Sequence, residues 1–351
     1  PSYGQIPPSF SLPAEDFCSA DLAEAIDAFR PDVVHLHWVC NSFLSLEDLA
    51  RISHPLVWSM HDSWPFTGGC HVPDACTAYR QQCGHCPLLG SNLEDDLSRQ
   101  LYIQKRQIFD HLDLTLVCPS HWMAECVKGS SLLGSRSIEV IPPGIDTSVF
   151  RPVDQSAARR TLGVPDDRTL ILFGGMSSTR DPNKGYDLLS MALSRIDDSA
   201  WQDGACLMIF GAAEEERVEA KHPVTEWHLG FLKDDLSLAI AYAAADVMVV
   251  PSRREAFGQT ALEALACGTP VVCFRTTGLV DIVDHQENGY LAEPYDVEDL
   301  GRGLLWATQP HLLTELQSNA RQKVEQAFPL DLYTSRHLSL YRKLFDSSGK
   351  V

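Results

Sequence analysis

Short apolar runs of strand length recur along the whole chain, separated by stretches with helical periodicity, and this alternation restricts the fold more than any other feature. The runs lie at 31–37, 55–60, 114–118, 170–174, 206–211, 247–250 and 270–274. Parallel strands covered by helices on both faces have this appearance, because neither face meets water. We therefore expect an α/β protein with doubly wound, Rossmann-like parallel sheets.

Two domains are the expected organisation. A chain of 351 residues can bury two separate cores. The turn-rich segment Ile141-Pro142-Pro143-Gly144-Ile145-Asp146 interrupts the alternation. We place the first domain at 1–147 and the second at 148–328. Residues 329–351 have a helical pattern, and we expect this C-terminal helix to pack back on the first domain.

Charge and composition exclude several classes of function. The 28 basic and 47 acidic residues give a net charge of −19, which opposes binding to nucleic acid or to anionic membranes. The 11 cysteines are an odd number and most lie singly in apolar runs, so we do not expect a secreted disulfide framework. No apolar run is as long as a membrane span, and residues 1–10 lack the pattern of a secretory signal. We expect a cytoplasmic protein.

The most informative segment is PSRREAFGQTALEALACGTPVV, residues 251–272. A buried strand ends at Ser252, a short loop carries Glu255, and a helix begins near Gly258. This arrangement puts a helix N-terminus at the carboxyl end of a parallel strand, where unpaired backbone N–H groups and the helix dipole attract a phosphate. Gly258 has no Cβ to block the approach. The segment therefore predicts a phosphate-binding helix start.

Two glutamates of this segment suit hydroxyl groups. Glu263 lies about five residues into the helix, so its carboxylate is roughly 7 Å from the helix start, about the step from a diphosphate to a ribose. A carboxylate accepts hydrogen bonds from two vicinal hydroxyls, which suits Glu263 for a ribose and Glu255 for a transferred sugar. Either glutamate alone reads more readily as an ordinary solvated acid. The ordered set of strand, Glu, Phe-Gly, Glu and Gly-Thr-Pro favours a sugar-nucleotide site.

This set resembles the donor-site motif of the retaining glycosyltransferase family 4, whose members have the GT-B fold of two Rossmann-like domains facing a cleft. The segment 183–187, NKGYD, resembles the family's Lys-Gly element. Residues 278–281 and 288–291 resemble the segment that closes the site, and 141–146 matches the inter-domain turn. The stretch HDSWPFTGGC, residues 61–70, is similar to the exopolysaccharide, colanic-acid-type subgroup.

The resemblance implies a retaining, metal-independent hexosyltransferase of polysaccharide biosynthesis. Its donor is a nucleotide diphosphate sugar, with a UDP-sugar favoured, and its acceptor is a saccharide or a lipid-linked saccharide. The first domain then lies on the acceptor side and the second binds the donor. No catalytic cofactor and no nucleic acid partner are implied, and membrane association at the inner face of the plasma membrane is at most weak and peripheral.

Family motifs also assign candidate residues. The catalytic candidates are His61, Lys184 and Glu255. The donor-binding candidates are Gly175, Arg180, Lys184, Phe231, Glu255, Ala256, Phe257, Gly258, Gln259, Thr260 and Glu263. A strand-end histidine satisfied by the backbone is the alternative for His61. His35 and His37 flank one strand and point to opposite faces, so at most one of them can join it.

Two departures from the family pattern affect these expectations. The family usually places an arginine two residues after a glycine at a strand end, but the segment GGMSS, residues 174–178, has none. Arg180 is the candidate replacement. Family members also open with a strand and a glycine-rich loop, which this sequence lacks. We therefore expect a first domain that is shortened at its N-terminus, with consequences for acceptor recognition.

Two other functions remain open. Non-hydrolysing sugar-nucleotide epimerases share the two-domain architecture, and a non-catalytic sugar-nucleotide-binding subunit would fit a shortened first domain. A separate expectation concerns four cysteines in a polar stretch, where the spacing of the last two is that of thiolates sharing one zinc ion. The candidate ligands of this structural zinc are Cys70, Cys76, Cys83 and Cys86. Free thiols or disulfides are the alternatives.

Overall fold

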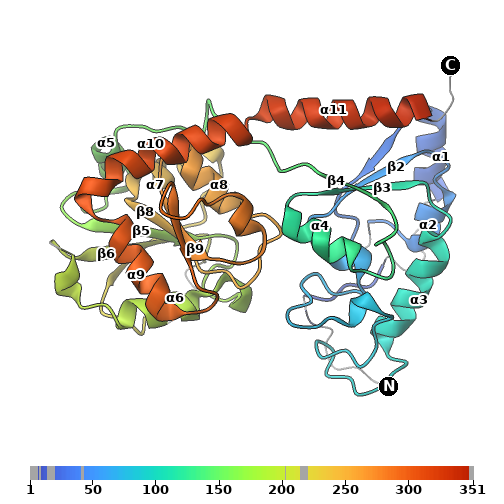
Figure 1. Ribbon diagram of the computed structural model, residues 1–351, viewed down its shortest axis with the longest axis horizontal. Helices are drawn as coiled ribbons and strands as arrows, with labels where there is room; N and C mark the ends of the chain where they lie inside the picture. Colours follow the sequence, from blue (N-terminus) through green and yellow to red (C-terminus); the bar gives the residue numbers. More distant parts are fainter. Residues whose placement is uncertain are drawn as a thin grey trace. The chain divides into compact units, whose positions relative to one another are not determined.

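The computed structural model divides into two compact units (Figure 1). Unit 1 contains residues 1–142 and 335–351, and unit 2 contains residues 143–334. The structure describes residues 7, 9–13, 20–40, 43–201, 203–213 and 220–347. Among them no helix combines the length and the apolar character needed to cross a bilayer.

Unit 1 is built on a parallel sheet of four strands in the order β1-β2-β3-β4. Its strands are β1 (Val34–Leu36), β2 (Leu56–Ser59), β3 (Leu114–Cys118) and β4 (Ser137–Val140). Its helices are α1 (Ala20–Phe29), α2 (Leu46–Arg51), α3 (Leu97–Phe109) and α4 (His121–Lys128). Helix α11 (Leu330–Ser347) begins in unit 2, and its residues from Ser335 onward belong to unit 1.

Unit 2 is built on a parallel sheet of six strands in the order β10-β9-β8-β5-β6-β7. Its strands are β5 (Thr169–Gly174), β6 (Ala205–Phe210), β7 (Thr225–Gly230), β8 (Val247–Val250), β9 (Val271–Phe274) and β10 (Gly289–Ala292). Its helices are α5 (Gln155–Leu162), α6 (Tyr186–Ser194), α7 (Asp235–Ala244), α8 (Gln259–Ala266), α9 (Val297–Ala307) and α10 (Pro310–Ala327).

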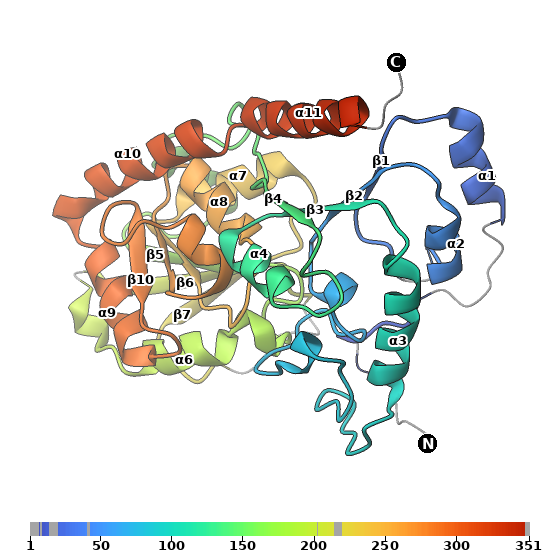
Figure 2. The same cartoon turned by 45° about the vertical axis from the view of Figure 1, so that its right-hand side comes forward.

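Two hydrophobic cores, one on each face of the six-stranded sheet, explain why its central strands are apolar throughout. Helices α5, α7, α8 and α10 cover one face and α6 and α9 the other (Figure 2). Residues of β5 alternate between the cores, with Leu170 and Leu172 in one and Ile171 and Phe173 in the other. The expected α/β class with two Rossmann-like parallel sheets is therefore confirmed.

Candidate functional site

The strand order of unit 2 reverses between β5 and β8, which pair directly. The chain runs outward from β5 to β7 on one side and from β8 to β10 on the other. In doubly wound sheets such a reversal opens a crevice at the carboxyl ends of the two strands, where ligands bind. Here the segments that leave those ends are 175–185 after β5 and 251–258 after β8.

These two segments are joined by backbone and side-chain hydrogen bonds centred on Asn183. Nδ2 of Asn183 donates to the backbone carbonyl of Arg254 at 2.8 Å. Oδ1 of Asn183 accepts from the backbone N–H of Arg254 at 3.1 Å. The backbone N–H of Arg253 donates to the Asn183 carbonyl at 2.8 Å. Gly185 has a φ of +72°, and a Cβ there would lie 2.1 Å from the carbonyl oxygen of Pro251. Only glycine permits this close approach.

This junction brings Lys184 and Glu255 together. The Lys184 ammonium donates to a Glu255 carboxylate oxygen at 2.8 Å, and the two side chains are 24% and 17% exposed. Gly175 lies beside them, since a Cβ there would be 3.7 Å from Cε of Lys184. The Glu255 backbone is fixed as well, because its N–H donates to Oγ1 of Thr277 at 3.1 Å. Three of the predicted site residues therefore share one location.

The start of α8 has the form expected of an anion site. Its N-cap is Gly258, with a φ of +117°, and a Cβ there would lie 2.6 Å from a Leu279 methyl carbon. No side chain caps this helix or α6, which also starts at a glycine, whereas α5, α7 and α9 are each capped by an aspartate. The first N–H groups of α8 therefore meet no capping oxygen and suit a phosphate. The candidates Ala256, Phe257, Gln259 and Thr260 surround this helix start.

Glu263 lies on α8 and is held by Tyr242 of α7. The Tyr242 hydroxyl donates to a Glu263 carboxylate oxygen at 2.7 Å. Burial raises the pKa of Glu263, and the hydrogen bonds from Tyr242 and Gln259 only partly offset this effect. A carboxylate has about four acceptor positions, so Glu263 retains capacity for a ligand hydroxyl beside these two bonds.

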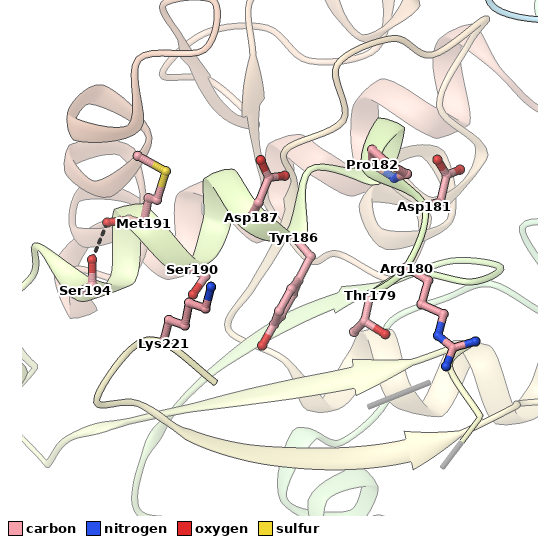
Figure 3. A pocket seen from close by; sticks show the side chains of 10 residues that line it. All are labelled: Thr179, Arg180, Asp181, Pro182, Tyr186, Asp187, Ser190, Met191, Ser194 and Lys221. Carbon is pink, nitrogen blue, oxygen red and sulfur yellow. Dashed lines mark hydrogen bonds between the residues drawn. The ribbon is translucent and has the colours of Figure 1, made fainter. Parts of the chain in front are cut away.

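Arg180 lies in a surface cavity of about 530 Å³ that includes neither Lys184 nor the two glutamates. Figure 3 shows Tyr186 and Ser190 on the same side of α6, with Lys221 beside Ser190 and with Ser194 and Arg180 near opposite ends of the group. Asp181 and Pro182 also line the cavity, and the short turn that they begin ends at Lys184. The cavity therefore adjoins the candidate donor site through one short turn. Phe231 follows β7 and is 52% exposed.

In unit 1, His61 follows β2 and pairs with His37, which follows β1. The two imidazoles lie 2.8 Å apart between Nε2 of His61 and Nδ1 of His37, with the rings stacked. Burial lowers the pKa of His61, and the neighbouring His37 lowers it further. The expectation that His35 and His37 point to opposite faces is wrong, because the two rings are stacked with centroids 4.4 Å apart. The ring nitrogens of His35 lie 2.9 Å from Oγ of Ser59 and 2.6 Å from the Tyr341 hydroxyl. Of the two strand-flanking histidines, His37 is the one that joins His61.

The predicted zinc site is not supported. Cys70, Cys76, Cys83 and Cys86 line one small cavity, but within the described ranges no group of three or more His, Cys, Asp or Glu side chains could hold a metal ion. Burial raises the pKa of Cys70 to about 11 and that of Cys83 to about 12. Sγ of Cys83 also accepts a hydrogen bond from the Gly68 N–H at 3.2 Å. Burial therefore favours the protonated form of Cys70 and Cys83.

Three residues of the site were not assigned a role from the sequence. Asn183 fixes the turn that carries Lys184, Thr277 fixes Glu255, and Tyr242 fixes Glu263. A signal existed for the first two, because each stands directly beside a motif residue, Lys184 or Gly278. Tyr242 carried no signal, since its partner lies 21 positions away and the contact depends on how α7 and α8 pack.

Family models match both parts of the chain. Residues 154–323 match the model described as glycosyl transferases group 1, and residues 3–149 match glycosyltransferase family 4. Among curated relatives, a D-inositol 3-phosphate glycosyltransferase of Geodermatophilus obscurus is 41% identical over 46% of this chain and 38% of its own length. One of Kribbella flavida is 28% identical over 89% of this chain and 71% of its own length. The chain thus spans well under half of the first of these relatives.

Solved structures share the fold. Sucrose-phosphate synthase of Thermosynechococcus elongatus superposes with a TM-score of 0.70 at 22% identity, covering 98% of this chain and 82% of that one. Anabaena Alr3699/HepE in complex with UDP and glucose gives a TM-score of 0.67 at 19% identity, covering 92% and 81%. At these identities the likeness concerns the fold.

Proposed function

We propose that this chain is a GT-B glycosyltransferase of family 4 and that it transfers a hexose from a UDP-sugar to a saccharide or lipid-linked saccharide acceptor. One observation carries the proposal: Lys184 and Glu255 meet 2.8 Å apart at the point where the strand order of unit 2 reverses. A cation and a carboxylate beside an uncapped helix start suit a ligand with a diphosphate and hydroxyl groups. The solved neighbour that holds UDP and glucose has the same fold and supports this choice of donor.

Each candidate residue then has a role. Lys184 and the first N–H groups of α8 bind the diphosphate, which Gly258 and Gly175 can approach closely. Glu263 accepts hydrogen bonds from the ribose at the acceptor positions that Tyr242 leaves available. Glu255 accepts from hydroxyls of the transferred sugar. The proposed donor-binding residues also include Arg180, Phe231, Ala256, Phe257, Gln259 and Thr260.

The proposed reaction proceeds with retention and without a catalytic metal ion. The acceptor hydroxyl attacks the anomeric carbon on the face of the leaving group. The bond between that carbon and the phosphate oxygen breaks, and this oxygen takes the acceptor's proton. Lys184 and the α8 helix start stabilise the charge that develops on the leaving diphosphate, which is the largest contribution such a site offers. We also propose His61 of unit 1 as a catalytic residue, on its place in the family motif.

The acceptor is proposed to be a saccharide of polysaccharide biosynthesis, on the likeness of residues 61–70 to the exopolysaccharide subgroup. The curated relatives named above act, by their names, on D-inositol 3-phosphate. We further propose a cytoplasmic location with weak peripheral membrane association at most, because a net charge of −19 opposes attraction to anionic lipid. Flotation with anionic liposomes tests the proposed weak membrane association, and strong, salt-sensitive binding would contradict it.

Thermal-shift measurements with UDP-, GDP- and ADP-sugars test the donor assignment. A ligand at 100 times its dissociation constant stabilises the folded protein by about 2.7 kcal/mol, so a UDP-sugar should raise the melting temperature more than the other two. Negligible shifts with all three would overturn the assignment. Product analysis separates the remaining alternatives: an epimerase interconverts donors without acceptor, and a non-catalytic subunit binds donor with neither transfer nor slow donor hydrolysis.

A further inference from the structure

An exposed tryptophan in unit 1 is held in a fixed orientation by its own polar atom. Trp38 follows β1 and 45% of its surface is exposed to water. Its indole Nε1–H donates to Oδ2 of Asp62 at 2.9 Å, and Asp62 follows β2. The ring of His71 lies beside the indole, with centroids 6.0 Å apart. An indole held in this way offers a ligand an apolar ring in a fixed orientation.

The tether is itself supported from several sides. Oδ2 of Asp62, which accepts from Trp38, also accepts from Nδ1 of His71 at 2.7 Å. Oδ1 accepts from the backbone N–H of Trp64 at 2.8 Å. Nε2 of His71 lies 2.8 Å from the Ser11 hydroxyl. A carboxylate has about four acceptor positions, so these three bonds leave one on Oδ1 for a further donor. The indole is preorganised beside an acceptor with spare capacity.

Two imidazoles complete the patch. His37 precedes Trp38 in the chain and pairs with His61 at 2.8 Å, and the carbonyl of His37 accepts from the buried indole of Trp58 at 3.0 Å. The patch therefore combines an apolar platform with hydrogen-bonding groups at its edge. A pyranose has matching chemistry, because its C–H face is apolar and its rim carries hydroxyls that both donate and accept.

Charge on the patch selects against phosphate. The shallow depression here is lined by ten described residues that include His37, Trp38, His61 and Asp62, and none of the ten is Lys or Arg. Burial lowers the pKa of His61, which favours the neutral form of its imidazole. An ionised Asp62 would repel a phosphate rather than bind it.

We propose that Trp38, Asp62 and His71 form an acceptor subsite for an uncharged pyranose that stacks on the indole of Trp38. This inference rests on the proposed transferase function and adds to it: the acceptor end is a neutral sugar, unlike the D-inositol 3-phosphate that names the curated relatives. The indole of Trp38 supplies the apolar stacking surface, which the polar groups of the patch cannot supply. Trp38 should therefore determine the affinity for the acceptor and not the affinity for the donor.

The experiment compares Trp38→Ala, Trp38→Phe and the control Trp227→Ala, which removes a tryptophan of similar exposure, 38%, from β7 in unit 2. The probes are methyl glucoside, galactoside and mannoside, with D-inositol 3-phosphate as the anionic comparison. Saturation-transfer NMR measures probe binding, and calorimetry measures UDP binding by the same samples. We expect at least one methyl pyranoside to bind the parent and Trp227→Ala alike. Its Kd should rise at least about tenfold in Trp38→Ala, with Trp38→Phe in between.

Three results would overturn the subsite. They are a parent that binds none of the pyranosides, a Trp38→Ala variant that binds them as the parent does, and D-inositol 3-phosphate binding more tightly than every pyranoside. UDP affinity should stay unchanged in all three variants, and circular dichroism spectra like those of the parent check that both units fold. If the parent binds a pyranoside through Trp38 but neither binds UDP nor transfers sugar, the transferase proposal fails and the saccharide site stands.

Discussion

The ammonium group of Lys184 lies 2.8 Å from the carboxylate of Glu255, so the two groups proposed to receive a donor neutralise each other when no donor is bound. Both side chains are partly buried, and solvent screening leaves such a pair a moderate interaction. A diphosphate that binds Lys184 competes with Glu255 for the ammonium group, and a Glu255 carboxylate released in this way can accept from sugar hydroxyls. We expect donor binding to weaken this ion pair.

Removing the lysine should disable transfer. We expect Lys184→Ala to lower kcat/KM by roughly a hundredfold or more, because the charge on the leaving diphosphate loses its main cationic partner. Steady-state kinetics with a UDP-sugar measures this. Lys323→Ala is the matched control, since Lys323 forms an ion pair of the same length, 2.8 Å, with Asp284 elsewhere in unit 2. Equal rates for Lys184→Ala and the control would make Lys184 a structural residue only.

Removing the glutamate should have a different effect. Glu255→Ala should reduce transfer while leaving the affinity for free UDP unchanged or tighter, since Lys184 no longer needs to be released from its partner. Calorimetric titration with UDP gives the affinity. In the double variant with Lys184→Ala, the loss of transfer should be smaller than the product of the single effects, because the two residues interact directly. A UDP affinity that falls in Glu255→Ala would contradict the assignment of this residue to the sugar.

Glu263 should contribute to nucleotide affinity and not to transfer of sugar already bound. Glu263→Ala should weaken UDP binding by about tenfold, since each hydrogen bond to a charged acceptor contributes about 1.5–3 kcal/mol. Tyr242→Phe is the informative partner variant, because it removes the hydroxyl that fixes one oxygen at 2.7 Å and leaves the carboxylate in place. It should weaken UDP less than Glu263→Ala does. Unchanged UDP binding by Glu263→Ala would exclude a ribose contact.

The pH dependence of the protein should report the buried state of Glu263. Burial raises the pKa of Glu263 above its ordinary value of 4.5, so the folded chain retains this proton to a higher pH than the unfolded chain does. The group therefore stabilises the fold less as pH rises from 4.5 through the raised pKa, while UDP affinity increases over the same range because the ionised carboxylate is the better acceptor. Glu263→Gln should show neither trend. If stability and UDP affinity depended on pH in the same way in the parent and in Glu263→Gln, Glu263 would not be the group responsible for the two trends.

The sequence predicted the central strands more accurately than the edges. The runs 114–118 and 247–250 correspond to β3 and β8 without any shift. The strands that were not predicted are β4, β7 and β10, and all three lie at the edge of a sheet. Edge strands meet water on one side, so their residues mix polar with apolar types and lose the continuous apolar pattern. Residues Thr225–Gly230 of β7 have only exposed and half-buried side chains.

Local motifs identified the site better than they could describe its contacts. The helix start at Gly258 could be predicted because a strand, a glycine and a helical pattern follow one another in the chain. The contact between Lys184 and Glu255 could not, since it spans 71 positions and depends on Asn183 joining two loops. The zinc expectation failed for a related reason: sequence spacing brings thiols near one another, but burial and backbone contacts decide how their sulfur atoms point.

The four clustered cysteines allow a test that is independent of activity. Burial raises the pKa of Cys70 to about 11 and of Cys83 to about 12, and the thiolate is the form that alkylating reagents attack. At pH 8 only about one thiol in a thousand or fewer is then ionised at these positions. Iodoacetamide should therefore modify Cys70 and Cys83 slowly in the folded protein and rapidly in guanidinium, as peptide mass spectrometry can measure.

A chelator separates this explanation from protection by metal. Thiols protected by burial react slowly whether or not EDTA is present, whereas thiols protected by a bound ion become reactive once the ion is removed. We expect the labelling rates of Cys70 and Cys83, and the melting temperature, to be the same with and without EDTA. The Cys83→Ser variant should keep its fold, since a hydroxyl can replace the sulfur as acceptor for the Gly68 N–H. Rapid labelling that appears only after chelation would show that a metal ion, and not burial, protects the cluster.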